Sequence, residues 1–285
     1  MKPQVQAFYH QPTSTVAYLV ADPASGQAAL IDPPLDFDAK RGRVGTQFAE
    51  GMLEAARAQG LTLAWILETH PHADHLSAAD YLRGKTGAPV ATGAGITSVQ
   101  ARFKALFGAD DVQPDGRCFD RLLQDGERLP LGELEVEVLE TPGHTAACVS
   151  YVIGDAAFVG DTLFMPDYGT ARTDFPGGDA ATLYRSIRRL LDLPPETRLF
   201  TGHDYPPKSR GPAWESTVAE QRAKNRHVHD GVSQAEYVQM RRARDATLEP
   251  PMLMLPSLQV NIRAGALPPP EADGHVYLRL PVNAL

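Results

Sequence analysis

The chain has 285 residues, of which 43% are hydrophobic and 22% charged. This is the balance of a globular protein with a sizeable core, not of a disordered chain. The formal net charge of -8 argues against nucleic acid as a partner, because phosphate binding needs a basic surface. Two cysteines, Cys118 and Cys148, are too few for a disulfide scaffold, and the lack of a Cys-x-x-Cys pair excludes a thiolate zinc site.

Residues 1–18 show neither a signal peptide nor a lipidation motif, and no segment is long enough to span a membrane. We therefore expect a cytoplasmic protein that does not bind membranes. The basic run at 241–244 is interpreted as a solvated helix face.

The first half of the chain predicts strands that alternate with helices. Apolar, β-branched runs end at Asp-Pro pairs or glycines, and helical segments show apolar residues three or four apart. In chain order the predicted elements are strands over 15–20 and 28–31, a helix over 45–59, a strand over 61–67, a helix from Asp74 or Ser77 to Gly87, a strand over 88–91 and a helix over 96–107.

The second half repeats this pattern, with strands over 134–139, 148–153, 156–159 and 198–201 and a helix over 182–191. Two runs of strands, each followed by helices, predict two sheets packed together with helices outside, a four-layer αββα sandwich of the α/β class. Residues 214–244 are predicted to be mostly helical, with a proline-rich tail after them. We therefore divide the chain into a main domain over 1–212 and a helical C-terminal extension over 213–285 that packs on it.

The strongest chemical signal is the segment His-Pro-His-Ala-Asp-His from His70 to His75. In an extended segment, residues two apart point the same way, so His70 and His72 can face one point. The turn into the next helix brings Asp74 and His75 to the same place. Imidazole and carboxylate together suit zinc, iron or manganese. A surface loop that is merely polar is the alternative, and the density of ligand-type residues at a strand end argues against it.

Three further strand ends carry residues of ligand type. A Pro-Gly turn can aim His144 inward. Asp161 follows an apolar strand, where a free carboxylate is costly unless a cation pairs with it. His203 follows the strand at 198–201. Each residue alone has an ordinary core or surface explanation, but four such strand ends together indicate one metal centre.

This order of motifs, His-x-His-x-Asp-His followed by Gly-His, Gly-Asp and Gly-His, resembles the signature of the metallo-β-lactamase superfamily from about residue 17 to residue 205. The resemblance implies a metal cleft at the edge of the two-sheet sandwich. By position, one metal would be held by His70, His72 and His144, and a second by Asp74, His75 and His203, with Asp161 able to bridge them.

Within the superfamily the chain is most similar to the persulfide dioxygenases, or sulfur dioxygenases, and to their Blh-type branch in the stretch 160–178. The segments that carry this similarity are 69–75, 141–145, 160–164, 172–175 and 203–205. The resemblance implies one Fe(II) per chain, held by His70, His144 and Asp161 as a 2-His-1-carboxylate triad with three open positions. It places His72, Asp74, His75 and His203 around the triad, where they orient ligands and hold waters.

The implied reaction oxidises glutathione persulfide, or a related persulfide, with O2 to sulfite and thiol in sulfide detoxification. Arg172 and Tyr205 match residues on the thiol-binding side of the family's cleft. Where the family carries an arginine that binds a glutathione carboxylate, this chain has His227, and the loop 206–213 is longer. The thiol carrier is therefore open between glutathione, another small thiol and a protein. Cys148 is expected to be a small buried packing residue.

Two other functions fit parts of the pattern. All seven ligand-type residues permit two Zn(II) ions, as in a glyoxalase II-like thioesterase or hydrolase, where a zinc-bound hydroxide attacks the thioester; a β-lactamase is a weaker alternative. The second is a sulfur or redox sensor that uses the site only for binding, which the complete ligand set argues against. We also expect a homodimer, because dimers are the commonest oligomers of soluble proteins.

Overall fold

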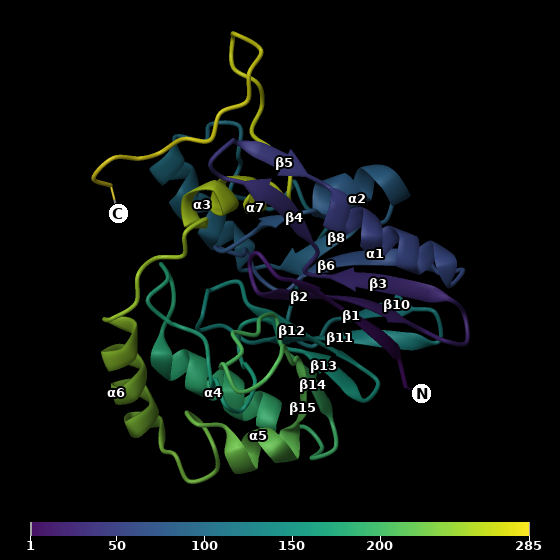
Figure 1. Ribbon diagram of the computed structural model, residues 1–285, viewed down its shortest axis with the longest axis vertical. Coiled ribbons are helices and arrows are strands. Elements are labelled where there is room, and N and C mark those ends of the chain that lie inside the picture. Colours follow the sequence, from purple (N-terminus) through teal and green to yellow (C-terminus); the bar gives the residue numbers. More distant parts are fainter. Residues whose placement is uncertain (1, 285) are drawn as a thin grey trace.

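The computed structural model describes residues 2–284 and contains two six-stranded sheets that stack face to face, with helices on both outer sides (Figure 1). The first sheet has the order β1 (Gln4–His10), β2 (Thr15–Ala21), β3 (Gln27–Ile31), β6 (Thr62–Glu68), β8 (Val90–Gly93) and β9 (Arg121–Leu123). The second has the order β10 (Arg128–Leu131), β11 (Leu134–Glu140), β12 (Val149–Ile153), β13 (Ala156–Phe158), β14 (Arg198–Phe200) and β15 (Glu215–Thr217). A small sheet joins β5 (Arg43–Gly45), β4 (Pro34–Asp38) and β7 (Leu76–Ser77). The predicted four-layer α/β fold is confirmed.

Both sheets mix antiparallel and parallel pairs. In the first sheet β3, β6, β8 and β9 are parallel neighbours, and parallel strands need crossover connections. These crossovers contain α1 (Gln47–Ala58), α2 (Ala79–Thr86) and α3 (Ile96–Phe107). In the second sheet only β13 and β14 are parallel, and α4 (Ala180–Leu191) connects them. The carboxyl ends of the parallel strands β6, β13 and β14 supply the loops that carry His70–His75, Asp161 and His203, whereas His144 follows the antiparallel strand β11.

Apolar side chains form three layers, because each sheet is covered on both faces. In the fully buried β2, successive side chains point to opposite faces. Val16 and Tyr18 enter the cluster between the sheets, whereas Ala17 and Leu19 enter the cluster under the helices of the first sheet. A third cluster packs α4 against the outer face of the second sheet.

The last three helices are divided between the two outer layers. Helices α5 (Val218–Lys224) and α6 (Gln234–Asp245) lie with α4 outside the second sheet, whereas α7 (Met254–Asn261) lies beside α3 on the other side (Figure 1). Capping boxes begin α5 and α6. The hydroxyls of Thr217 and Ser233 accept from the backbone N–H groups of Glu220 and Glu236, whose carboxylates accept from the backbone N–H groups of Thr217 and Ser233. The stretch between α6 and α7 therefore crosses from one layer to the other.

The prediction of a mostly helical stretch over 214–244 is only partly right. Helices α5 and α6 lie in it, but Glu215–Thr217 form β15, the edge strand of the second sheet. Three residues are too few for a periodic pattern to reveal a strand. The division at residue 212 stays a prediction, and residues of the extension contribute both to this sheet and to both helical layers. No helix among residues 2–284 is long and apolar enough to cross a membrane.

Candidate metal centre

The ligand-type residues lie on loops that leave the strands at one edge of the sandwich. Strand β6 leads into His70–His75, and β11 into the turn before His144. In the parallel pair β13–β14, Phe158 lies opposite Phe200, and Asp161 and His203 each follow three residues later. Loops of equal length therefore carry these two side chains together, and His203 Nδ1 lies 2.6 Å from Asp161 Oδ1.

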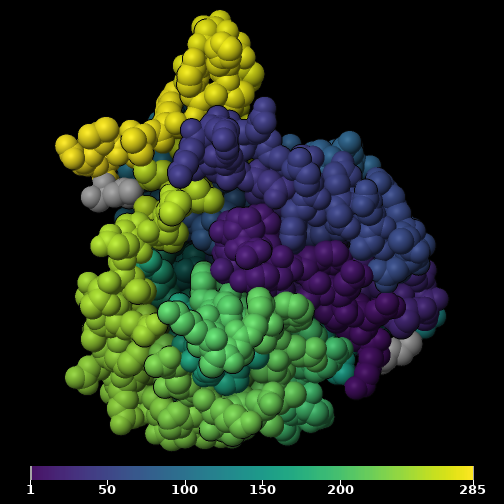
Figure 2. All heavy atoms as spheres, in the orientation of Figure 1, coloured from purple at the N-terminus to yellow at the C-terminus, as the bar shows by residue number. Residues whose placement is uncertain are grey.

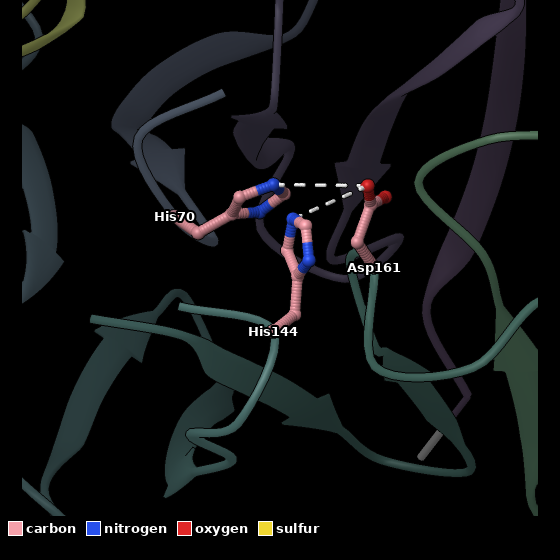
Figure 3. A group of neighbouring side chains, drawn as sticks. All are labelled: His70, His144 and Asp161. Carbon is pink, nitrogen blue, oxygen red and sulfur yellow. Dashed lines mark ion pairs between the residues drawn. The ribbon is translucent and has the colours of Figure 1, made fainter. Parts of the chain in front are cut away.

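Three of these side chains converge on one point. The Nε2 atoms of His70 and His144 lie 3.9 and 3.8 Å from Asp161 Oδ2 (Figure 3). The ligand atoms of all three residues lie within 4.8 Å of one another, and all three residues are buried. Atoms that bind one metal at about 2.0–2.2 Å lie about 3–4 Å apart. The spacing is therefore close to that of ligands around a single cation.

Hydrogen bonds decide which ring nitrogen of each histidine faces this point. Thr69 Oγ1 donates to Asp32 Oδ2 at 2.7 Å, so it can only accept from His70 Nδ1 at 2.9 Å. His144 Nδ1 donates to the carbonyl oxygen of Arg172 at 2.8 Å. Both rings therefore carry the proton on Nδ1 and present the lone pair of Nε2 to Asp161, as metal-binding histidines do. Burial and the neighbouring imidazoles lower the pKa of His70, which favours the neutral ring that metals bind.

A second group consists of His72, Asp74 and His75, whose ligand atoms also lie within 4.8 Å of one another. His75 Nδ1 donates to the carbonyl of Leu76 at 3.1 Å, which leaves its Nε2 free. His72 Nε2 lies 3.1 Å from Asp32 Oδ1 without the geometry of a hydrogen bond.

The unsatisfied polar atoms of the fold gather in these two groups. Within residues 2–284, five buried side-chain nitrogen or oxygen atoms have no hydrogen-bond partner, and four of them are ring nitrogens of His70, His72 and His75. Such an atom costs about 1–3 kcal/mol if it stays unsatisfied, and a bound cation satisfies it. The residues therefore fit a metal.

His203 lies between two carboxylates. Its Nδ1 contacts Asp161 Oδ1 at 2.6 Å and its Nε2 contacts Asp74 Oδ2 at 2.5 Å. Burial lowers the pKa of His203, but the charges of Asp161 and Asp74 outweigh it and raise this pKa to about 10. Both ring nitrogens are thus engaged, and Asp161 keeps only Oδ2 for His70 and His144.

A cavity of about 260 Å³ opens onto His144 and Asp161. A larger hollow adjoins this cavity where N-terminal residues, in purple, face the C-terminal segment, in yellow-green (Figure 2), and Asp74, Tyr205 and Pro251 line both. In the cavity at His144 and Asp161, aromatic residues form one part of the wall, and leucine, proline and arginine residues after residue 240 form another. The lining includes Phe164, Tyr168, Tyr205, Arg241, Arg244, Leu248 and Pro251. The cavity gives a small substrate access to the centre between these walls.

The three predicted substrate residues lie in different places. Tyr205 lines the cavity, and its ring stacks parallel to that of His203 at 5.7 Å. Arg172 also lines it, but its guanidinium is bound to Asp174 at 2.6 and 2.7 Å. His227 is buried behind the wall, where its Nδ1 accepts from the Thr170 N–H at 3.1 Å.

The sequence interpretation missed several residues of the site. Asp32, which was assigned to a turn, accepts hydrogen bonds from both the N–H and the hydroxyl of Thr69. The interpretation of 241–244 as a solvated helix face is wrong for Arg241, which is 1% exposed; Arg244 is half-buried and lines the cavity, a place that the sequence did not reveal. Cys148 is buried as expected, and burial raises the pKa of its thiol to about 12.

Comparison with known proteins agrees with this fold. Residues 10–203 match the model of the Metallo-beta-lactamase superfamily, and the chain belongs to this family. It is 53% identical, over 99% of its length, to the "Beta-lactamase hydrolase-like protein" of Agrobacterium fabrum, of which it spans 65%. It is 45% identical to "Glyoxylase B2" of Dictyostelium discoideum, over 100% of this chain and 98% of that protein.

Other relatives carry a different name. The chain is 29% identical to "Persulfide dioxygenase ETHE1, mitochondrial" of Bos taurus, over 94% of this chain and 91% of that protein. The crystal structure of ETHE1 from Myxococcus xanthus matches with a TM-score of 0.74 and 31% identity, over 92% of this chain and 100% of that one. The family is thus established, whereas its named members differ in reaction.

Replacing His144 tests the metal centre. We expect His144→Ala to weaken metal binding by more than about 100-fold, since loss of a residue that merely orients a ligand already costs about 10–100-fold. Elemental analysis after dialysis against a weak chelator measures the metal-to-chain ratio. The matched control is His229→Ala, an exposed histidine outside the site. Equal metal content in the two variants would show that His144 is not a ligand.

Proposed function

We propose that this chain is an Fe(II)-dependent persulfide dioxygenase. The balanced reaction is RSSH + O2 + H2O → RSH + H2SO3, in which the two sulfur atoms together supply the four electrons that reduce O2. The observation that carries the proposal is the convergence of His70, His144 and Asp161 on one point at the base of the cavity. Two histidines and one carboxylate are the ligand set typical of non-haem iron oxygenases.

The contacts of His203 support one metal over two. Because both of its ring nitrogens are engaged by Asp161 and Asp74, a second metal would have to displace these contacts. When bound, Fe(II) supplies electrons for O2 and open coordination positions for both reactants. The protein holds the ligands and positions the reactants.

The residues around the triad hold the ligands and shape the cavity. Thr69 and the Arg172 carbonyl fix the two imidazole rings by their Nδ1 atoms. Phe164 and Tyr205 lie edge to face at 6.0 Å on the wall and limit the water around a bound sulfur atom. Bringing two reactants together in such a site contributes up to about 7–11 kcal/mol in well-oriented cases.

The comparisons support two different reactions. The similarity to ETHE1 in sequence and structure favours the dioxygenase. The names of the Agrobacterium and Dictyostelium relatives favour a hydrolase of the glyoxalase II type. The group formed by His72, Asp74 and His75 could hold the second Zn(II) that this alternative requires. The cytoplasmic location and the homodimer remain predictions.

Oxygen consumption tests the proposal directly. Protein loaded with Fe(II) under anaerobic conditions should consume O2 and release sulfite when it receives glutathione, cysteine or coenzyme A persulfide. An oxygen electrode follows the O2 that is consumed, and a sulfite assay follows the sulfite that is formed. Protein loaded with Zn(II) and given a glutathione thioester is the parallel test. Hydrolysis of the thioester, without O2 uptake for any persulfide, would contradict the dioxygenase and favour the hydrolase.

Arg244 is expected to bind an anionic group of the substrate. Two other arginines of the cavity are paired, Arg172 with Asp174 and Arg241 with Asp245, whereas Arg244 has no ion pair in the described part of the chain. Hydrogen bonds to charged groups contribute about 1.5–3 kcal/mol, so Arg244→Ala should raise KM by about 10–100-fold and change kcat little.

Steady-state O2 uptake with glutathione persulfide gives both constants. Arg242→Ala is the control, because Arg242 is exposed on the same helix and outside the cavity. A KM that rises equally in both variants, or in neither, would remove Arg244 from the substrate site.

A further inference from the structure

The chain beyond residue 203, outside the part that matches the family model, contacts the metal centre from two directions. We propose that Asn261 at the end of α7 and Asp245 at the end of α6 are positioning residues, which hold the ligand loops in the geometry that binds metal. The inference requires a metal at the centre and does not depend on which reaction follows.

Asn261 connects α7 to the loop that carries the histidine motif. Its Nδ2 donates to the carbonyl oxygens of His72 and His75, both at 2.8 Å. Its Oδ1 accepts from the Ser77 N–H at 2.8 Å. Asn261 is 4% exposed, so no solvent competes for these contacts. One amide group therefore fixes three backbone groups of a single loop.

This loop has little else to hold its backbone. Within the described chain, no N–H or carbonyl group of residues 70–75 makes a backbone–backbone hydrogen bond. Buried backbone polar groups require partners, and two of the carbonyls in this loop find theirs in Asn261. This amide therefore helps to hold the backbone from which the side chains of His72 and His75 project.

Asp245 holds a different loop from the opposite side. Its Oδ2 accepts from the N–H and the hydroxyl of Thr173, both at 2.9 Å. Its Oδ1 binds Arg241 at 2.6 Å, and Arg241 Nη1 donates to the Thr170 carbonyl at 3.1 Å. Helix α6 thus fixes both ends of the segment 170–173 through a buried ion pair.

The middle of that segment orients a ligand. The carbonyl oxygen of Arg172, between the two anchored threonines, accepts the Nδ1 proton of His144 at 2.8 Å. If Thr173 loses its anchor, this carbonyl can move, and the ring of His144 can turn its Nε2 away from Asp161. Partners of this kind typically contribute about 10–100-fold to metal affinity.

Asn261→Leu tests the first residue, because it removes all three hydrogen bonds and keeps the number and branching of the side-chain heavy atoms. We expect metal affinity, measured by competition with a chelator, to fall by about 10–100-fold and the absorption spectrum of the Co(II)-loaded protein to change. Circular dichroism and thermal unfolding of the metal-free variant show whether it is folded.

Gln259→Leu is the matched control on the same helix. Gln259 is also buried and also makes three hydrogen bonds, but to Leu255 and Arg279, away from the centre. The two variants should lose similar thermal stability, and only Asn261→Leu should lose metal affinity. Equal metal affinities would overturn the role of Asn261. If Asn261→Leu does not fold, Asn261→Asp, which keeps the acceptor for Ser77, takes its place.

The double variant Arg241→Met/Asp245→Leu tests the second residue. Replacing a buried ion pair by apolar residues is often neutral for stability, so the fold should persist while Thr173 loses its anchor. We expect metal affinity to fall by about 10-fold or more, with a changed Co(II) spectrum.

The control is Arg263→Met/Asp111→Leu, which removes an ion pair between the C-terminal segment and the stretch after α3, with 2.7 Å between its charged atoms. A Co(II) spectrum and an affinity equal to those of this control would overturn the role of Asp245. If the double variant does not fold, Asp245→Asn is measured instead. Because metal affinity is measured without substrate, failure of the proposed reaction leaves this result unaffected.

Discussion

The metal centre depends on which ring nitrogen of each histidine binds the protein and which one is left for a metal. His70 and His144 each commit Nδ1 to a protein acceptor and leave Nε2 directed at Asp161. At His70 the hydrogen bond that orients the ring thus leaves a buried Nε2 atom without a partner, at a cost that the rest of the fold must offset. A cation removes this cost, so metal binding and folding are linked in this protein. The two sheets serve as a rigid frame that brings loops from both halves of the chain to this point.

The sequence predicted the layers and the ligand-type residues for the same reason: both are local patterns. Alternating and helical spacing reveal which faces are buried, and His70, His144, Asp161 and His203 each follow a recognisable strand. The supporting contacts have no such signal. Asn261 lies 189 residues from His72 in the chain, and only tertiary structure brings such distant residues together. The three-residue strand β15 was missed because it is too short to show a period.

The geometry around Asp161 shows why the family name alone does not determine the reaction. One carboxylate oxygen binds His203 and the other faces the pair formed by His70 and His144. A fold that keeps all the ligand-type residues for two metals can favour the binding of one metal when hydrogen bonds occupy some of those residues. Chemistry in such folds is decided by a few side-chain contacts, and the sandwich itself is common to many functions.

The stretch between α6 and α7 passes from one outer helical layer to the other (Figure 1) and supplies Leu248 and Pro251 to the cavity wall. It donates no atom to the triad, and its ends are tied down by the two helices. Changes of side chain there would reshape the entrance, whereas changes of length would also move the Glu249 carbonyl that accepts from Arg172, whose own carbonyl orients His144. Substitutions of Leu248 or Pro251 can therefore change the shape and polarity of the entrance, and with it which small molecules fit, without replacing a residue of the triad.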